Sequence, residues 1–212
     1  MKAPLAPPHD CPLCPRLHAF RQQNRRKYPD WFNDPVPSFG PLTARILIAG
    51  LAPGLQGANR TGRPFTGDWA GDLLYATLLK HGLAKGIYEE RADDSLELAD
   101  CRIANAVRCV PPQNKPEPSE IKTCRPFLKS ELESLPHVKV VLALGKIAHD
   151  SVCDTLGARK ALHPFKHGAT YEIGKFMLIS SYHCSRYNTN TGVLTTKMFE
   201  DVVEKAKKLA ET

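Results

Sequence analysis

The chain has 212 residues, 42% of them hydrophobic and 24% charged, which is typical of a globular protein with a substantial core. No apolar run approaches the roughly 20 residues that cross a bilayer, and the first residues lack the apolar segment of a secretory signal. The formal net charge of +7 favours a polyanionic partner such as nucleic acid. We therefore expect a cytoplasmic monomer with no membrane partner, associated with the nucleoid if it binds DNA.

The first 44 residues are predicted to form an arm and a helix. Proline-rich residues 1–10 precede a C-x2-C pair, Cys11 and Cys14, and a basic helix is expected over 16–28. Residues 29–41 are rich in proline and aromatic side chains, so we expect them to pack irregularly against the rest of the domain.

The most distinctive stretch runs from Gly50 to Asp68 and contains the residues GLAPGLQGANRTGRPFTGD. It connects a predicted buried strand over 45–49 to a predicted helix over 71–83. Nineteen residues are many for such a connection, which usually takes about two to six. Its five glycines permit close approach of the backbone to a ligand, and a flexible surface tether would have no obvious use for Phe65. We expect this loop to form the floor of a binding pocket.

A polar residue, Asn105, interrupts the next predicted strand near its end. This strand covers 101–107 and follows a charged linker over 89–100. A buried asparagine is costly unless its polar atoms are paired, so Asn105 is either a satisfied turn amide or a group that binds a ligand. A proline-rich loop over 109–118 follows.

The second half of the chain alternates between helices and strands. Ser119 is the expected N-cap of a helix that reaches Leu135, with Pro126 causing a kink or a later start. The elements predicted after it are a strand over 138–144, a helix over 146–156, a strand pair over 171–173 and 176–180, the polar loop SYHCSRYNTNTGVLT, and a last helix to Ala210 capped by Thr195 or Thr196.

This order predicts an α/β fold, in which residues 1–212 form a single three-layer α/β/α domain with a central, mostly parallel four-stranded sheet. Ligands bind beyond the carboxyl ends of the strands in such sheets. The glycine-rich loop, Asn105 and the second polar loop all follow strands at those ends. The sequence therefore predicts one pocket built from three separate segments.

Four of the seven cysteines form two spaced pairs, Cys11 with Cys14 and Cys109 with Cys124. An odd number of cysteines without a secretory signal argues against a disulfide framework. Four thiolates can hold zinc or an iron–sulfur cluster, and the spacing does not choose between them. The alternative is a set of separate buried cysteines, as expected for the other three.

The glycine-rich loop could instead hold phosphate groups through its backbone N–H groups. It lacks both the Gly-Lys-Ser/Thr ending of a P-loop and the GxGxxG pattern of dinucleotide-binding folds. A nucleotide-binding enzyme is therefore a weaker alternative.

Taken together, GLAPG with GRPFTGD, Asn105 in NAVRCVPP, the loop HCSRYNTNTG and the four spaced cysteines resemble the uracil-DNA glycosylases. They look most like family 5, or type B, whose members carry an iron–sulfur cluster, and the resemblance extends from Cys11 to the last helix. It implies an enzyme that flips uracil, and other deaminated bases such as hypoxanthine, out of DNA and hydrolyses the N-glycosidic bond to leave an abasic site.

The resemblance also implies roles for individual residues in the pocket. Phe65 would stack on the flipped base, Asn105 would bond its Watson–Crick edge, and His183 would donate to its O2 and stabilise the developing anion. Further contacts with the substrate would come from Gly50, Leu51 and Gly54.

DNA contacts and the metal site complete the expected set. The residues expected to contact DNA are Asn59, Arg60, Arg63, Ser185, Arg186, Tyr187 and Asn188. Of these, Arg186, Tyr187 and Asn188 would enter the minor groove together with residues 189–192. The four paired cysteines would hold a structural [4Fe–4S] cluster, with residues 1–44 contributing two of the ligands.

The group that activates the attacking water stays open. Better-known branches place a carboxylate or amide after the first glycine of the first motif, where this chain has Leu51, as family 5 does. Asp68 and the backbone at Ala52 and Gly54 are the candidates, and Asp68 is equally well explained as a helix N-cap. The alternative to an enzyme is a non-catalytic, metal-containing module that binds nucleic acid.

Overall fold

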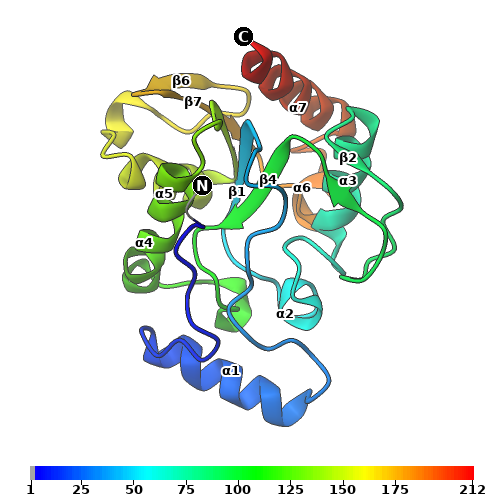
Figure 1. The fold of residues 1–212 in the computed structure, drawn as a ribbon, viewed down its shortest axis with the longest axis vertical. Coiled ribbons are helices and arrows are strands. Elements are labelled where there is room, and N and C mark those ends of the chain that lie inside the picture. Colours follow the sequence, from blue (N-terminus) through cyan, green and yellow to red (C-terminus); the bar gives the residue numbers. More distant parts are fainter. Residues whose placement is uncertain (1–2) are drawn as a thin grey trace.

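The fold is known from a computed structural model, which describes residues 3–212 (Figure 1). At its centre lies a five-stranded sheet in the order β4-β1-β5-β7-β6, in which only β6 is antiparallel to its neighbour. The strands are β1 (Ile46–Gly50), β4 (Cys101–Asn105), β5 (Val140–Leu144), β6 (Thr170–Ile173) and β7 (Phe176–Ser181). The expected α/β class is confirmed, but the sheet has five strands and not four, because both arms of the last hairpin join it.

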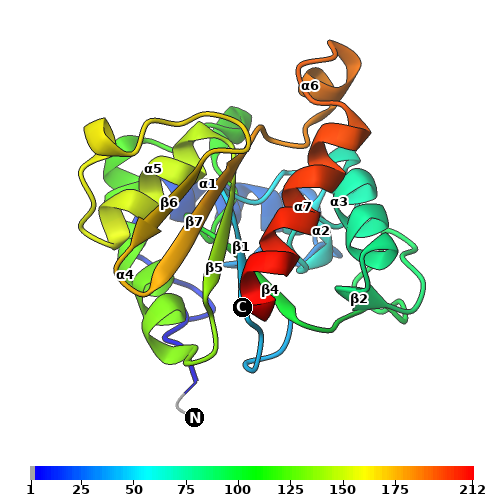
Figure 2. The same cartoon turned by 90° about the horizontal axis from the view of Figure 1, so that it is seen from above.

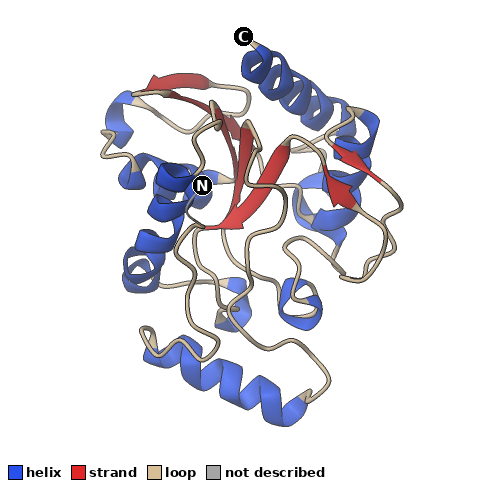
Figure 3. Cartoon of the chain, in the orientation of Figure 1, coloured by secondary structure: helices blue, strands red, loops and turns tan. Residues whose placement is uncertain are grey.

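Seven helices surround this sheet among the described residues (Figure 3). They are α1 (Pro15–Lys27), α2 (Ala58–Thr61), α3 (Trp69–Lys80), α4 (Pro118–Ser134), α5 (Lys146–Thr155), α6 (Arg186–Asn190) and α7 (Thr196–Glu211). Two short 3-10 turns lie at Pro112–Asn114 and Lys160–Leu162, and the short strands β2 (Ala84–Lys85) and β3 (Glu97–Leu98) pair with each other. No helix in this part of the chain is both long and apolar enough to cross a membrane.

Successive side chains of each strand point to opposite faces of the sheet and pack in two separate cores. In β1, Ile46 and Ile48 belong to the core under α3 and α7, whereas Leu47 and Ala49 belong to the core under α4 and α5. All five residues of β1 are buried, as expected for a central parallel strand covered on both faces. Figure 2 shows the two helix pairs on opposite sides of the sheet. These layers confirm the expected three-layer arrangement.

The N-terminal segment packs at the end of the sheet from which the glycine-rich loop leaves. Figure 1 shows α1 lying below the sheet, away from its two helical layers. A third, smaller core joins Leu17 of α1 to Val107, Phe127 and the paired cysteines. Residues 3–44 therefore pack on the same domain.

Local capping explains where the observed helices depart from their predicted limits. Helix α3 begins at Trp69 because the Asp68 side chain accepts a hydrogen bond from the Gly71 N–H. Helix α4 begins earlier than predicted because Glu117 and Glu120 form a capping box, so Ser119 is not the cap, and Pro126 lies within the helix.

The charged linker and the two functional loops also hold more regular structure than their composition indicates. The linker over 89–100 contains β3, the glycine-rich loop contains α2, and the second polar loop contains α6. Thr195 caps α7, as one of the two predicted alternatives.

Candidate active site

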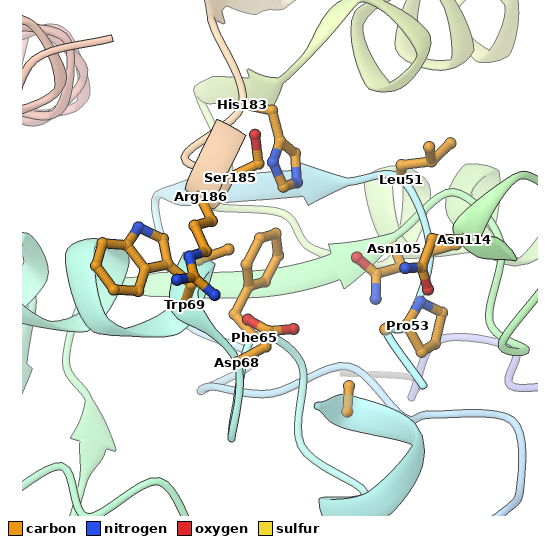
Figure 4. A pocket seen from close by; sticks show the side chains of 14 residues that line it. Leu51, Pro53, Phe65, Asp68, Trp69, Asn105, Asn114, His183, Ser185 and Arg186 are labelled. Carbon is orange, nitrogen blue, oxygen red and sulfur yellow. The ribbon is translucent and has the colours of Figure 1, made fainter. Parts of the chain in front are cut away.

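The predicted segments enclose one cavity at the carboxyl ends of β1 and β4, with a volume of about 360 Å³ (Figure 4). Strand register places Gly50, the last residue of β1, opposite Asn105, the last residue of β4. The cavity is lined by Leu51, Ala52, Pro53, Gly54, Ala58, Phe65, Asp68, Trp69, Ala70, Asn105, Asn114, His183, Ser185 and Arg186. The glycine-rich loop thus does form a large part of the pocket wall, as predicted.

Gly50 allows two functional side chains to lie directly against its backbone. A Cβ atom at this position would lie 2.3 Å from Asn105 Oδ1 and 2.8 Å from the Phe65 ring. Asn105 is buried, and its Oδ1 has no hydrogen-bond partner. An unpaired buried amide oxygen is costly in a protein interior, so this observation favours a group that binds a ligand over a satisfied turn amide.

Phe65 is held in an unusual backbone conformation. Its φ is +52°, in the left-handed region that is uncommon for aromatic residues. Its carbonyl packs so closely on Gly71 that a Cβ there would lie 1.9 Å away, and Tyr88 Oη donates to the same carbonyl at 3.4 Å. A strained conformation persists only where the surroundings determine it, so these contacts hold the backbone that carries the Phe65 ring.

The prediction that Arg63 contacts DNA is wrong, because its guanidinium is buried. It makes two 2.7 Å hydrogen bonds to the Asp94 carboxylate and one of 2.8 Å to Thr66 Oγ1, and it lies near the rings of Phe39, Tyr75 and Tyr88. These hydrogen bonds lower the pKa of Asp94 to about 2. Arg63 therefore anchors the loop that carries Phe65.

Asn59 is likewise not available to DNA. It is fully buried in α2, where its Nδ2 donates to Asn33 Oδ1 at 2.9 Å. Arg60, its neighbour, is exposed, although its Nε donates to the Gln56 carbonyl. Of the three residues predicted from this part of the loop, Arg60 alone is placed to meet a DNA backbone.

Replacing Arg63 by methionine is expected to destabilise the protein by about 3–5 kcal/mol, because Asp94 is left as an unpaired buried charge. The ion pair stabilises the fold at pH values above the ordinary Asp pKa of 3.8, and this stabilisation is lost as the pH falls towards about 2. Urea unfolding at pH 7 and pH 3 would measure this change. If the wild type and Arg63→Met differed in unfolding free energy by the same amount at both pH values, this prediction would be contradicted.

His183 lies across the cavity from the loop, on the segment that follows β7. Its ring centroid is 6.0 Å from that of Phe65, and the two planes are inclined by 29°. Burial lowers the pKa of His183, so its imidazole is neutral at neutral pH. Asn188 Nδ2 donates to the His183 carbonyl at 2.8 Å, and Gly145 at the end of β5 leaves room for its Cβ. The pocket therefore contains a neutral donor that faces an aromatic ring.

Asp68 is both a helix cap and a part of the cavity wall. It caps α3 through Gly71, and its carboxylate also forms part of the cavity wall, against the backbone of Gly57, where a Cβ would lie 2.3 Å from Oδ2. Burial raises the pKa of Asp68, and the N–H groups of Gly71 and Ala70 oppose that rise. A buried carboxylate in a cleft is a candidate general base.

The second polar loop presents side chains at the cavity mouth. Ser185 and Arg186 line the cavity, and Ser185 Oγ accepts from the Asn188 N–H as the N-cap of α6. Tyr187 is 74% exposed. Figure 2 shows α6 projecting beyond the body of the protein. This placement suits a segment that reaches into a partner molecule.

The four paired cysteines meet in one pocket beneath α1. Within residues 3–212, no group of three or more His, Cys, Asp or Glu side chains is arranged to hold a metal ion. Burial raises the pKa of Cys109 to about 12 and that of Cys124 to about 11. Cys101, Cys153 and Cys184 lie elsewhere in the two main cores, as expected.

A buried cation lies beside these thiols. Arg21 is fully buried, and it donates to Cys109 Sγ at 2.7 Å and to the Cys11 carbonyl at 2.8 Å. Its nearest carboxylate, that of Asp10, is 3.6 Å away and half exposed. A buried guanidinium needs anionic partners, and ligating thiolates would supply them. The Arg108 N–H also donates to Cys124 Sγ, at 3.3 Å. This donor set fits an anionic sulfur site.

A family model described as the uracil DNA glycosylase superfamily matches residues 37–207. The chain belongs to this superfamily.

Two relatives named type-5 uracil-DNA glycosylase match nearly the whole chain. That of Thermus thermophilus is 48% identical over 207 residues, which cover 94% of both chains. That of Pyrobaculum aerophilum is 39% identical over 201 residues, which cover 93% of this chain and 88% of the relative. A type-4 uracil-DNA glycosylase of Thermotoga maritima is 30% identical over 169 residues, or 79% of each chain. Within the superfamily, the higher identity and coverage place this chain with type 5.

Five lining residues of this uracil-DNA glycosylase are not among the predicted site residues, and two of them, Trp69 and Asn114, have side chains with hydrogen-bonding groups. Trp69 was overlooked because an aromatic residue at a helix start is as easily explained by core packing, yet it is 48% exposed at the cavity mouth. Asn114 was hidden in the proline-rich loop, and its positive φ of 57° is a turn feature that the sequence indicates only weakly.

Proposed function

We propose that this chain is a monofunctional uracil-DNA glycosylase that acts as a monomer on chromosomal DNA and leaves an abasic site. The observation that carries this proposal is the unpaired, buried Oδ1 of Asn105, which lies in a cavity beside the fixed ring of Phe65. A nucleobase stacked on Phe65 would offer a polar edge with which this amide could form hydrogen bonds. The superfamily match and the type-5 relatives support the same function.

In this proposal, Asn105 reads the Watson–Crick edge of the base. Its amide can donate to O4 and accept from N3–H of uracil, whereas the N4 amine and bare N3 of cytosine cannot satisfy it. Phe65 stacks on the base. A site built around hydrogen bonds of this kind discriminates strongly, because a wrong partner leaves buried polar groups unpaired. Hypoxanthine and other deaminated bases with a carbonyl at the corresponding edge are proposed as further substrates.

Cleavage of the N-glycosidic bond builds negative charge on the leaving base and positive charge on the sugar. We propose that His183 donates to O2 of the base and so stabilises the developing anion. The low local dielectric of the pocket strengthens this interaction. The carboxylate of Asp68, or the backbone at Ala52 and Gly54, would hold the attacking water, since Leu51 has no polar group to do so.

Replacing Asp68 by asparagine separates its two roles. Asparagine is as good an N-cap as aspartate, so the thermal unfolding temperature is expected to change little. Loss of a general base is expected to lower kcat by about 10²-fold or more. Since the pKa of Asp68 is raised, wild-type activity should fall on acidification at a higher pH than for an ordinary Asp. Full activity of Asp68→Asn in single-turnover assays would reduce Asp68 to a helix cap.

DNA contacts are proposed for the exposed residues near the cavity mouth. Arg60 would meet the phosphate backbone. Arg186, Tyr187 and Asn188, with the Ser185 cap holding α6, would enter the minor groove beside the flipped nucleotide.

We also propose that Cys11, Cys14, Cys109 and Cys124 hold a structural [4Fe–4S] cluster, with the N-terminal arm contributing two of the four ligands to the single domain. Four cysteines lining one pocket, with N–H donors aimed at two of the sulfurs, support this assignment. When bound, such a cluster would supply a covalent tie between the arm, α4 and the strand end that carries Asn105.

The deciding experiment is base release from oligonucleotides that contain uracil, hypoxanthine or a thymine mismatch, with alkaline cleavage to reveal abasic sites. Release of uracil by the wild type but not by Asn105→Ala supports the proposal, and release of hypoxanthine extends it. If protein with an intact metal centre binds DNA yet releases no base, the chain is instead a non-catalytic binding module.

A further inference from the structure

Helix α6 has too few residues to be stable by itself. It spans Arg186–Asn190, and isolated helices of this length do not form in water. Most of its side-chain hydrogen bonds stay within its own segment, such as those of Ser185 with the Asn188 N–H and of Asn188 with the His183 carbonyl. Something outside this segment must therefore determine how α6 is oriented.

Trp69 makes the contacts that tie α6 to another layer of the fold. Its Nε1–H donates to Thr189 Oγ1 at 2.8 Å. Among the described residues, this side-chain hydrogen bond is the one that joins α6 to another helix. The Arg186 guanidinium lies over the same indole, 5.6 Å from the ring centroid. Figure 4 shows Trp69 and Arg186 side by side at one side of the cavity.

These two contacts determine the rotation of α6 about its own axis. Arg186 and Thr189 are three residues apart and therefore share one face of the helix. With that face held on the indole, Tyr187 is left 74% exposed on another side. The backbone that carries the indole is itself held, because Trp69 is the first residue of α3 and follows the Asp68 cap.

The indole of Trp69 is also more exposed to solvent than core packing would explain. It is 48% exposed, although it is among the largest apolar side chains. An exposed indole at the mouth of a site is more consistent with a role in that site than with core packing.

We propose that Trp69 is a positioning residue that orients α6 for insertion into duplex DNA. The proposal rests on the proposed glycosylase function and names the group that prepares α6 for it. Because the helix is already held in the free protein, less conformational entropy is lost when it binds DNA. A single strand has no stacked gap for α6 to fill, so the benefit is specific to duplex substrates.

The test compares kcat/KM on duplex and single-stranded oligonucleotides of the same uracil-containing sequence. For Trp69→Ala, the loss on the duplex is expected to exceed the loss on the single strand by about tenfold, the combined effect of one hydrogen bond and one cation–π contact. Trp31→Phe, at the other tryptophan, is the matched control and should change neither value.

Two milder variants separate the contacts. Trp69→Phe retains a ring beneath Arg186 but loses the N–H donor, and Thr189→Val loses the acceptor while keeping its shape. Each is expected to lower duplex activity by a few-fold. Thr189→Val also removes the hydrogen bonds from its hydroxyl to the carbonyls of Ser185 and Arg186, so the double variant should lose no more than Thr189→Val alone. Additive losses in the double variant would overturn the assignment of this bond.

A second measurement is independent of turnover. In a Trp31→Phe background, Trp69 is the sole tryptophan, and its fluorescence reports its surroundings. A change on binding duplex, but not single-stranded, DNA is expected. Equal activity losses on both substrates, or no loss on either, would overturn the proposal. A wild type that releases no base from any substrate would instead refute the proposed function.

Discussion

Replacing His183 by alanine is expected to lower kcat by about 10²–10³-fold, the loss typical of removing one donor to a developing anion. The imidazole lies opposite the Phe65 ring in a buried cavity, where a hydrogen bond to charge is worth more than in water. The effect should be confined to the chemical step. Single-turnover cleavage of a uracil-containing duplex at saturating enzyme would measure it directly.

The pH dependence of the same reaction tests the protonation state of His183. Because burial lowers its pKa, the imidazole remains neutral from its ordinary value of 6.5 upwards and gains a proton only at lower pH. The rate should therefore show no His183 titration between pH 6.5 and 8. His137→Ala, at an exposed histidine far from the cavity, is the matched control. A His183→Ala variant with an unchanged rate would remove this residue from the site.

Replacing Cys109 by serine is expected to affect folding more than chemistry. Cys109 lies under the buried Arg21 and packs with Leu17 of α1, so the loss of its sulfur would loosen the arm as well as the proposed metal site. Ligand binding by a structural metal centre is part of the folding free energy, and its loss commonly prevents folding. We expect low soluble yield, loss of visible absorbance and iron, and a lower urea midpoint.

Cys101→Ser supplies the comparison that isolates the metal site. Cys101 is also fully buried, but its Sγ donates to the Leu83 carbonyl, a hydrogen bond that serine can retain. This variant should keep its iron and most of its yield. Cys109→Ser protein that loses its colour but retains the same yield and urea midpoint would contradict a structural role for the cluster.

Much of the pocket could be predicted because its parts carry local signals. The buried strand β1 and the glycine-rich loop after it are visible in composition alone, and the rule that parallel sheets bind ligands at their carboxyl ends brings Asn105 and His183 to the same edge. The unusual residue in each segment, an asparagine at a strand end and a phenylalanine among glycines, does line the cavity.

Other features depend on partners that are distant in sequence. Nothing near Arg63 shows that Asp94 will neutralise it from a segment 31 residues away, so its charge was wrongly assigned to DNA. Asn59 was misplaced for the same reason, since its partner is Asn33. Trp69 was missed because its role arises only where α3 and α6 meet. Residue type predicts what a side chain can bind, but topology decides which partner reaches it.

The lack of space at Gly50 has a consequence for how this pocket can diversify. Any side chain there would collide with both the Asn105 amide and the Phe65 ring, so a single substitution would displace both groups together. Leu51 and Ala52, the two residues that follow the glycine, also line the cavity and already carry side chains. Under the proposed function, a variant with a changed base preference is therefore expected to arise by substitution at these two positions and not at the glycine.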